Sequence, residues 1–196
     1  MAVRSIMIVG VGGQGTLLAS RIIGNVLLAE GHDVKVSEVH GMSQRGGSVV
    51  TYVRYGENVS APTIEKGGAD IILSFELLEA MRWVPYLKKG GKMIINNQQI
   101  DPMPVITGAA SYPEKILETL GESGISYEAI DALDLALQAG NSKAVNVVLI
   151  GLMAKHTDIP KEKWLASLEK TVPQKFLELN KKAFDRAGLI YGMGHA

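Results

Sequence analysis

Cysteine is absent from this chain of 196 residues. Disulfides, cysteine-ligated iron–sulfur clusters and thiolate zinc sites all need cysteine, so this chain can build none of them, and the absence is consistent with a cytoplasmic protein. Net charge is absent as well, because 20 basic residues balance 20 acidic ones. No global field therefore favours a nucleic acid or an anionic membrane, and any anion that binds here must be bound locally.

Long apolar runs are also lacking. The longest stretch, residues 145–154 with Gly151 inside it, is too short to cross a bilayer and is typical of a buried helix. The run at 6–9 ends in glycines instead of a cleavage site, which indicates a first strand and not a signal peptide. With 46% hydrophobic residues and no repeat, the chain is expected to form one globular domain over residues 1–196.

The pattern of short β-rich runs and helical segments predicts an α/β fold with a Rossmann-like, mostly parallel sheet and a helical C-terminal third. The segment 76–89 reads as one helix, because acidic residues open it and Lys88, Lys89 and a Gly-Gly pair close it. The segment 98–113 carries three prolines and is expected to be a loop or an extended crossing. The predicted strands are residues 5–9, 34–39, 48–55, 70–74, 92–97 and 126–130; other predicted helices begin at Thr16 and near Glu114.

Two glycine-rich loops follow the first two predicted strands, at residues 10–15 and 41–47. Glycine permits positive φ and lets a ligand approach the peptide groups closely. A helix that begins at Thr16 would also point the positive end of its dipole at the first loop. We therefore expect the two loops to meet at one end of the sheet and to bind a phosphate or a carboxylate; the alternative is that each loop is an ordinary tight turn.

The first loop also fits a dinucleotide-binding pattern. Gly10, Gly12 and Gly15 have the GxGxxG spacing between a strand and a helix, and Glu38 ends the second strand, where a ribose-binding acid would be sought. A lone GxGxxG is a weak signal, and no constellation typical of hydride transfer stands out. A protein that binds NAD(P) therefore remains an alternative.

Other polar residues suggest no chemistry of their own. The four histidines lack the spacing of metal ligands. Asn96 and Asn97 are like the end of a thiamine-diphosphate motif, but the Gly-Asp-Gly that opens this motif is missing, so the chain cannot bind that cofactor in the usual way. Asn141 is interpreted as a helix cap and Asn146 as a polar packing residue.

Four segments carry a specific resemblance to a known family. The stretches at 10–20, 38–50, 69–82 and 140–146 closely resemble the gamma-type component of 2-oxoacid:ferredoxin oxidoreductases. They are spread between residues 10 and 146, and the similarity is expected to cover nearly the whole chain. The sequence at 42–47 favours the arylpyruvate branch, whose substrate is indolepyruvate.

The resemblance implies that this chain is the accessory subunit of a heteromeric oxidoreductase. The complex would convert an arylpyruvate, coenzyme A and oxidised ferredoxin into arylacetyl-CoA, carbon dioxide and reduced ferredoxin. A large alpha subunit would hold thiamine diphosphate, Mg and the 4Fe-4S clusters, since this chain has neither cysteine nor Gly-Asp-Gly. This chain would close the active site and position phosphates, and by itself it would be inactive.

The resemblance also suggests where ligands bind. No residue is assigned to catalysis and none to a metal. The alternatives to this subunit role are a stand-alone NAD(P)-binding oxidoreductase and a non-catalytic assembly scaffold. The expected backbone contacts to phosphates of the cofactor or coenzyme A are Gly12, Gly13, Gln14 and Gly15, and the expected substrate-side contacts are Ser43, Gln44, Arg45, Gly46 and Gly47.

Overall fold

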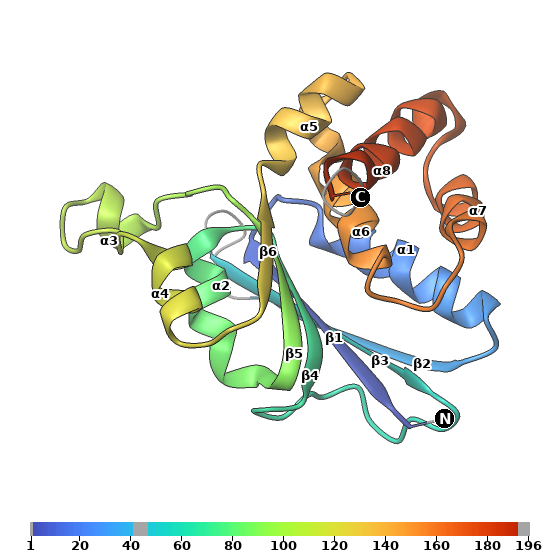
Figure 1. Cartoon of the computed structure of the whole chain (residues 1–196), viewed down its shortest axis with the longest axis horizontal. Coiled ribbons are helices and arrows are strands. Elements are labelled where there is room, and N and C mark those ends of the chain that lie inside the picture. Colours follow the sequence, from blue (N-terminus) through green and yellow to red (C-terminus); the bar gives the residue numbers. More distant parts are fainter. Residues whose placement is uncertain (1, 41–46, 192–196) are drawn as a thin grey trace.

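The computed structural model describes residues 2–40 and 47–191, and its centre is a six-stranded sheet with helices on both faces (Figure 1). The order of the strands is β2-β3-β1-β4-β5-β6. This confirms the predicted α/β class with a mostly parallel sheet. The strands are β1 (Arg4–Val11), β2 (Asp33–His40), β3 (Ser48–Gly56), β4 (Ala69–Ser74), β5 (Leu87–Asn96) and β6 (Tyr127–Ile130).

Beyond β6 the described chain is helical, as predicted, but a short helix at Met103–Ile106 lies inside the segment 98–113 that was predicted as a loop or an extended crossing. The α-helices are α1 (Thr16–Ala29), α2 (Leu77–Trp83), α3 (Met103–Ile106), α4 (Ile116–Glu122), α5 (Ala132–Ala139), α6 (Val145–Ala154), α7 (Lys161–Thr171) and α8 (Leu177–Tyr191). Short 3-10 turns are η1 (Val84–Tyr86), η2 (Ser142–Ala144) and η3 (Gln174–Phe176).

Strand β3 runs opposite to its two neighbours, β1 and β2. Residues 41–47 join it to β2, and so short a connection cannot form the crossover that parallel neighbours require. The pairs β1–β4, β4–β5 and β5–β6 are parallel. As a result β3 separates β1 from β2, which matters for the site described below.

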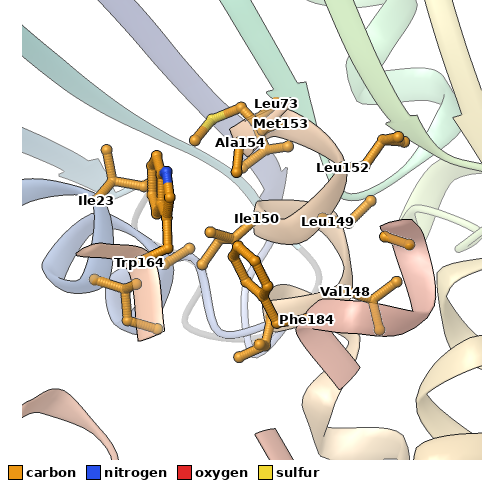
Figure 2. Close-up of a cluster of buried hydrophobic side chains, with 14 of the residues drawn as sticks. Ile23, Leu73, Val148, Leu149, Ile150, Leu152, Met153, Ala154, Trp164 and Phe184 are labelled. Atoms are coloured by element: carbon orange, nitrogen blue, oxygen red, sulfur yellow. The ribbon is translucent and has the colours of Figure 1, made fainter. Parts of the chain in front are cut away.

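Each face of the sheet packs against its own set of helices (Figure 1). Alternation along β1 sends Ile6 and Ile8 into the cluster formed with α1, α6, α7 and α8, and sends Met7 and Val9 into the cluster formed with α2 and α4. Figure 2 shows the first cluster, where Trp164 lies beside Ile23 and Phe184 lies beside Ile150. Both faces of the sheet centre are therefore buried.

Helix α6 is enclosed on all sides. Every residue from Asn146 to Ala154 is buried, which confirms that the apolar stretch is a core helix. Gly151 allows α6 to approach α8 closely, because a Cβ there would lie 2.3 Å from the carbonyl oxygen of Phe184. No described helix combines the length and the apolarity needed to span a bilayer.

The helix predicted over residues 76–89 is shorter than the sequence suggests. Helix α2 ends at Trp83, a 3-10 turn with Pro85 follows, and β5 begins at Leu87. The pairing of β5 with β4 shifts between Ala69 and Ile71, and Gly90 takes φ 80° within this irregular stretch. The prediction of a helix to residue 89 was wrong, because the Lys-Lys-Gly-Gly run that looks like a helix end lies in the irregular part of strand β5.

Candidate functional site at the glycine loop

The first glycine loop connects β1 to α1 at the carboxyl end of the parallel strands. Gly13 (φ 98°) and Gly15 (φ 83°) take left-handed conformations that other residues rarely adopt. Gly15 is the N-cap of α1, and no described side chain caps this helix. The N–H groups of its first turn therefore face outward, as the anion-binding prediction requires. A Cβ on Gly13 would meet open space, so the loop is accessible on that side.

Gln14 has a structural role that the sequence did not reveal. Its side-chain oxygen accepts a hydrogen bond from the N–H of Val11 (2.7 Å), and its side-chain nitrogen donates to the carbonyl oxygen of Phe75 (2.9 Å). Gly10 permits this bridge, since a Cβ there would lie 2.8 Å from the Gln14 oxygen. The carboxamide of Gln14 thus holds the loop after β1 against the loop after β4.

The two glycine loops touch, as the sequence predicts. The N–H of Gly12 donates to the carbonyl oxygen of Gly47 at 3.0 Å. This bond occupies the Gly12 N–H, whereas those of Gly13 and Gly15 have no acceptor among the described residues. The predicted contacts Ser43, Gln44, Arg45 and Gly46 lie outside the described residues.

A pocket of about 420 Å³ opens beside the first loop. Gly13, Gly15, Lys143 and Asn146 are among the residues that line it. Lys143 is exposed and lies in no ion pair with another described residue. The pocket thus combines outward N–H groups, a helix N-terminus and a cation, which together suit an anionic group. Its other lining residues are Gln14, Leu18, Gln98, Ile100, Leu133, Ser142 and Val145.

The two asparagines near this pocket have the structural roles predicted for them. The side chain of Asn141 accepts a hydrogen bond from the N–H of Lys143 (2.9 Å) and so caps η2. Asn146 is buried; its side chain donates to the carbonyl oxygen of Gly15 at 3.3 Å and accepts from the N–H of Val147 at 2.9 Å. A Cβ on Gly15 would lie 2.9 Å from the Asn146 amide nitrogen. Asn146 therefore fixes the start of α6 against the glycine loop.

The position of Glu38 does not suit a nicotinamide dinucleotide. Glu38 pairs with Thr51 on β3, and Thr51 pairs with Ile8 on β1. The acid therefore lies two strand spacings from β1, or about 10 Å. In the dinucleotide fold the acid belongs to the strand next to the glycine-loop strand. The order of the strands thus places Glu38 too far from the GxGxxG loop to serve as the ribose-binding acid of an NAD(P) site.

Two buried glutamates near the site were missed by the sequence analysis. Glu76 is 1% exposed and follows β4 directly. It accepts hydrogen bonds from the N–H of Glu79 (2.9 Å), the N–H of Ile100 (3.1 Å) and the hydroxyl of Tyr112. Burial, and after it the hydrogen bond and negative charge of Glu76, raise the pKa of Tyr112 above its usual range. The hydroxyl of Tyr112 thus stays protonated as a donor.

Glu79 anchors the start of β3 to α2. Its carboxylate accepts from the hydroxyl of Ser48, and also from the side chains of Arg82 and Trp83 at 3.0 Å each. Little in the sequence indicated that Glu76 and Glu79 are buried, because acidic residues in the first turn of a helix are usually exposed to solvent, where they interact with the helix dipole. Their burial follows from tertiary packing. In the ranges 2–40 and 47–191, no three His, Asp or Glu residues are grouped so that they could hold a metal ion.

Comparison with known proteins assigns the chain to a family. The family model described as pyruvate ferredoxin/flavodoxin oxidoreductase matches residues 5–189. The chain belongs to this family. Within the family it is 44% identical over 188 residues to indolepyruvate oxidoreductase subunit IorB of Thermococcus kodakarensis, covering 92% of each chain. It is 45% identical over 186 residues to the protein of the same name from Pyrococcus horikoshii, again covering 92% of each.

Solved structures related to the family share the fold. The gamma subunit of keto/oxoacid ferredoxin oxidoreductase from Geobacter sulfurreducens superimposes with a TM-score of 0.70 at 23% identity, covering 95% of this chain and 99% of that one. The 2-oxoglutarate:ferredoxin oxidoreductase from Magnetococcus marinus gives a TM-score of 0.75 at 17% identity. There the match covers 98% of this chain and 31% of the other, so the same fold is part of a longer polypeptide.

Proposed function

We propose that this chain is the smaller, accessory subunit of an indolepyruvate:ferredoxin oxidoreductase, which forms arylacetyl-CoA from arylpyruvates. The observation that carries the proposal is the identity of 44–45%, over 92% of the chain, to proteins named indolepyruvate oxidoreductase subunit IorB. More distant relatives at 26–27% identity are named as a gamma subunit common to pyruvate and ketoisovalerate oxidoreductases. Both names describe one component of a heteromer.

In this proposal the cofactors belong to the partner. The chain has no cysteine to ligate a 4Fe-4S cluster, and it lacks the Gly-Asp-Gly of the usual site for thiamine diphosphate with Mg, so its residues do not fit either group. When bound to the large subunit, thiamine diphosphate would supply the decarboxylation and the clusters the transfer of electrons to ferredoxin. The complex would lie in the cytoplasm.

The role left to this chain is to position an anionic group of a substrate. Gly13 and Gly15 present N–H groups without an acceptor among the described residues, Gly13 borders open space, and Lys143 lines the same pocket. We propose that this pocket takes a phosphate of coenzyme A or of the cofactor at the interface. Gly12 and Gln14 would support the loop through their bonds to Gly47 and Phe75. Ser43, Gln44, Arg45, Gly46 and Gly47 remain the proposed substrate-side contacts.

The test of the subunit role is reconstitution. The chain should be co-expressed with a large subunit that carries thiamine diphosphate and iron–sulfur clusters, and assayed for ferredoxin reduction that depends on indolepyruvate and coenzyme A. We expect turnover from the complex and none from either chain alone. Turnover by the isolated chain, or micromolar binding of NAD(P) to it in calorimetry, would contradict the proposal and favour the dehydrogenase alternative.

A second experiment tests the pocket. Replacing Lys143 with alanine in the reconstituted complex should raise KM for coenzyme A about two- to fivefold with little change in kcat, because a solvent-exposed ion pair contributes up to about 1 kcal/mol of binding. Lys66→Ala is the matched control, since Lys66 is also exposed but lies outside the pocket. Equal KM values for the two variants and the wild type would remove Lys143 from the site. Full turnover after several substitutions in both loops would favour the scaffold alternative.

A further inference from the structure

A projecting segment between β5 and α4 is not explained by the site. We call residues 98–115 the arm; it extends away from the sheet and carries α3 at its tip (Figure 1). Met103 and Ile106, both on α3, are 60% and 65% exposed. No residue of α3 belongs to either of the two described hydrophobic clusters. None is among the partly buried side chains that pack against those clusters either. The tip therefore presents large apolar side chains to solvent.

The outer part of the arm, residues 102–113, also lacks charged side chains. It contains no Asp, Glu, Lys, Arg or His, although 20% of the whole chain is charged. Single exposed apolar residues are ordinary, but a projecting, uncharged and apolar segment is typical of an interaction site. The core of a protein–protein interface is likewise depleted in charged residues. The composition of the tip thus matches a surface that is buried in a complex.

The backbone of the tip satisfies its own hydrogen bonds. The N–H of Ile106 donates to the carbonyl oxygen of Pro102 (3.1 Å), and that of Ala110 donates to the carbonyl oxygen of Pro104 (3.0 Å). The hydroxyl of Thr107 donates to the carbonyl oxygen of Met103 at 2.9 Å. Because these bonds close within the tip, docking needs no rearrangement of the backbone, and little ordering entropy is lost.

The base of the arm is fixed to the body of the protein. Buried Glu76 accepts from the N–H of Ile100 on one side of the arm and from the hydroxyl of Tyr112 on the other. The same hydroxyl accepts from the N–H of Leu78 at 2.9 Å. The outgoing and the returning segments of the arm are thereby both held at the start of α2. An element that is rigid at its base and apolar at its tip can insert into a preformed pocket of a partner.

We propose that the arm docks this chain on the large subunit of the oxidoreductase, with Met103 and Ile106 buried in an apolar pocket of that subunit. This inference rests on the proposed function, which supplies the partner. The names of the relatives support this occupant: proteins at 44–45% identity are called subunits of an oxidoreductase, so another chain of the same enzyme is expected to bury an apolar tip. A second copy of this chain is the competing occupant, and the experiment below distinguishes the two.

The test compares the affinity of the full chain and of its variants for the isolated large subunit. Met103→Asp and Ile106→Asp should each weaken binding about tenfold or more, because each buries a charge in the apolar pocket. Met103→Gln and Ile106→Gln introduce a polar side chain without a charge, and they should also weaken binding to the large subunit. Leu28→Asp is the matched control: Leu28 is 56% exposed in the last turn of α1, a helix that packs on the other face of the sheet from α2 and α4 (Figure 1).

Oxidation of the wild-type chain gives a second readout that needs no variant. Met103 in the free chain should be converted to the sulfoxide by hydrogen peroxide, and this conversion should slow about tenfold in the complex, as measured by mass spectrometry of its peptide. Equal rates in the free and bound chains would overturn the proposal.

The outcomes separate this inference from the function. Weak binding by the tip variants with wild-type binding by Leu28→Asp supports the arm. Equal affinities for all chains, or equal losses in the tip variants and the control, overturn it while leaving the subunit role intact. Tip variants that abolish self-association but still bind the large subunit would identify a second copy as the occupant. If the wild-type chain does not bind the large subunit at all, the proposed function fails, and the inference fails with it.

Discussion

Replacing Gly151 with alanine is expected to destabilise the protein by about 3 kcal/mol or more. Its Cβ would lie 2.3 Å from the carbonyl oxygen of Phe184, and 3.1 Å and 3.2 Å from the carbonyl and α carbons of the same residue. These are backbone atoms of α8, so no rotamer change relieves the clash. The two helices would have to separate, and the cluster around Trp164 and Phe184 would lose its close packing (Figure 2).

Helix propensity acts in the opposite direction at Gly151 but is the smaller effect. Alanine is favoured over glycine in a helix interior by about 1 kcal/mol, whereas overpacking a core typically costs about 1–3 kcal/mol, and more where the obstacle is backbone. The clash should therefore outweigh helix propensity, so that Gly151→Ala lowers the free energy of unfolding. The free energy of unfolding, from urea titration followed by circular dichroism, measures the difference.

Gly24→Ala provides the matched control. Gly24 lies inside α1, and a Cβ there would meet one neighbouring atom within 4 Å, the Cγ2 of Val36 at 3.9 Å, which is an ordinary contact. The same substitution should thus stabilise the protein by about 0.5–1 kcal/mol. A Gly151→Ala variant as stable as the wild type would show that α6 and α8 are not packed as closely as the structure has them.

Replacing Glu76 with alanine is expected to lower the free energy of unfolding by about 3 kcal/mol. The carboxylate is 1% exposed and accepts from three donors. Its removal leaves the N–H groups of Glu79 and Ile100 and the hydroxyl of Tyr112 without their acceptor, and each unmet buried donor costs about 1–3 kcal/mol unless water replaces the lost partner. The N-cap of α2 is lost at the same time.

The effect of Glu76→Ala should be concentrated in the arm. Hydrogen exchange across residues 98–115 should accelerate more than exchange in β1 or α6, because Glu76 binds the arm at both Ile100 and Tyr112. Glu118→Ala is the control, since the side chain of Glu118 is 66% exposed and its partner Lys115 is 3.6 Å away; it should change stability little. Uniform acceleration in the Glu76 variant would mean that the arm is not tethered separately from the rest of the fold.

Local patterns in the sequence were sufficient for most elements of this fold. β-Rich runs located the strands, the apolar stretch at 145–154 identified a buried helix, and Asn141 and Asn146 were assigned to capping and packing. Each of these features depends on neighbours a few residues away or on hydrophobicity alone. The glycine loops were likewise visible, and the contact between Gly12 and Gly47 confirms that they meet.

The errors and omissions involve partners distant in sequence. The run from Lys88 to Gly91 reads as a helix end, but it lies in an irregular part of β5 where the pairing with β4 shifts. Gln14 was assigned to ligand contact through its backbone, while its side chain bridges to Phe75, 61 residues away. Glu76 binds Tyr112 across 36 residues. No local pattern reports such contacts, because they exist only after the chain has folded.

The residues alone determined the class of the fold, the exclusion of cysteine-based cofactors and the resemblance to the gamma-type components. Composition and short-range periodicity encode the first two properties, and the sequence motifs at 10–20, 38–50, 69–82 and 140–146 carry the resemblance. The tertiary structure decided what surrounds the glycine loop: the antiparallel strand β3 places Glu38 two strands from β1, and Lys143 lines the same pocket as Gly13. It also decided that the arm projects with an apolar tip. Strand order and exposure depend on which distant segments pack together, which is why only the folded chain revealed them.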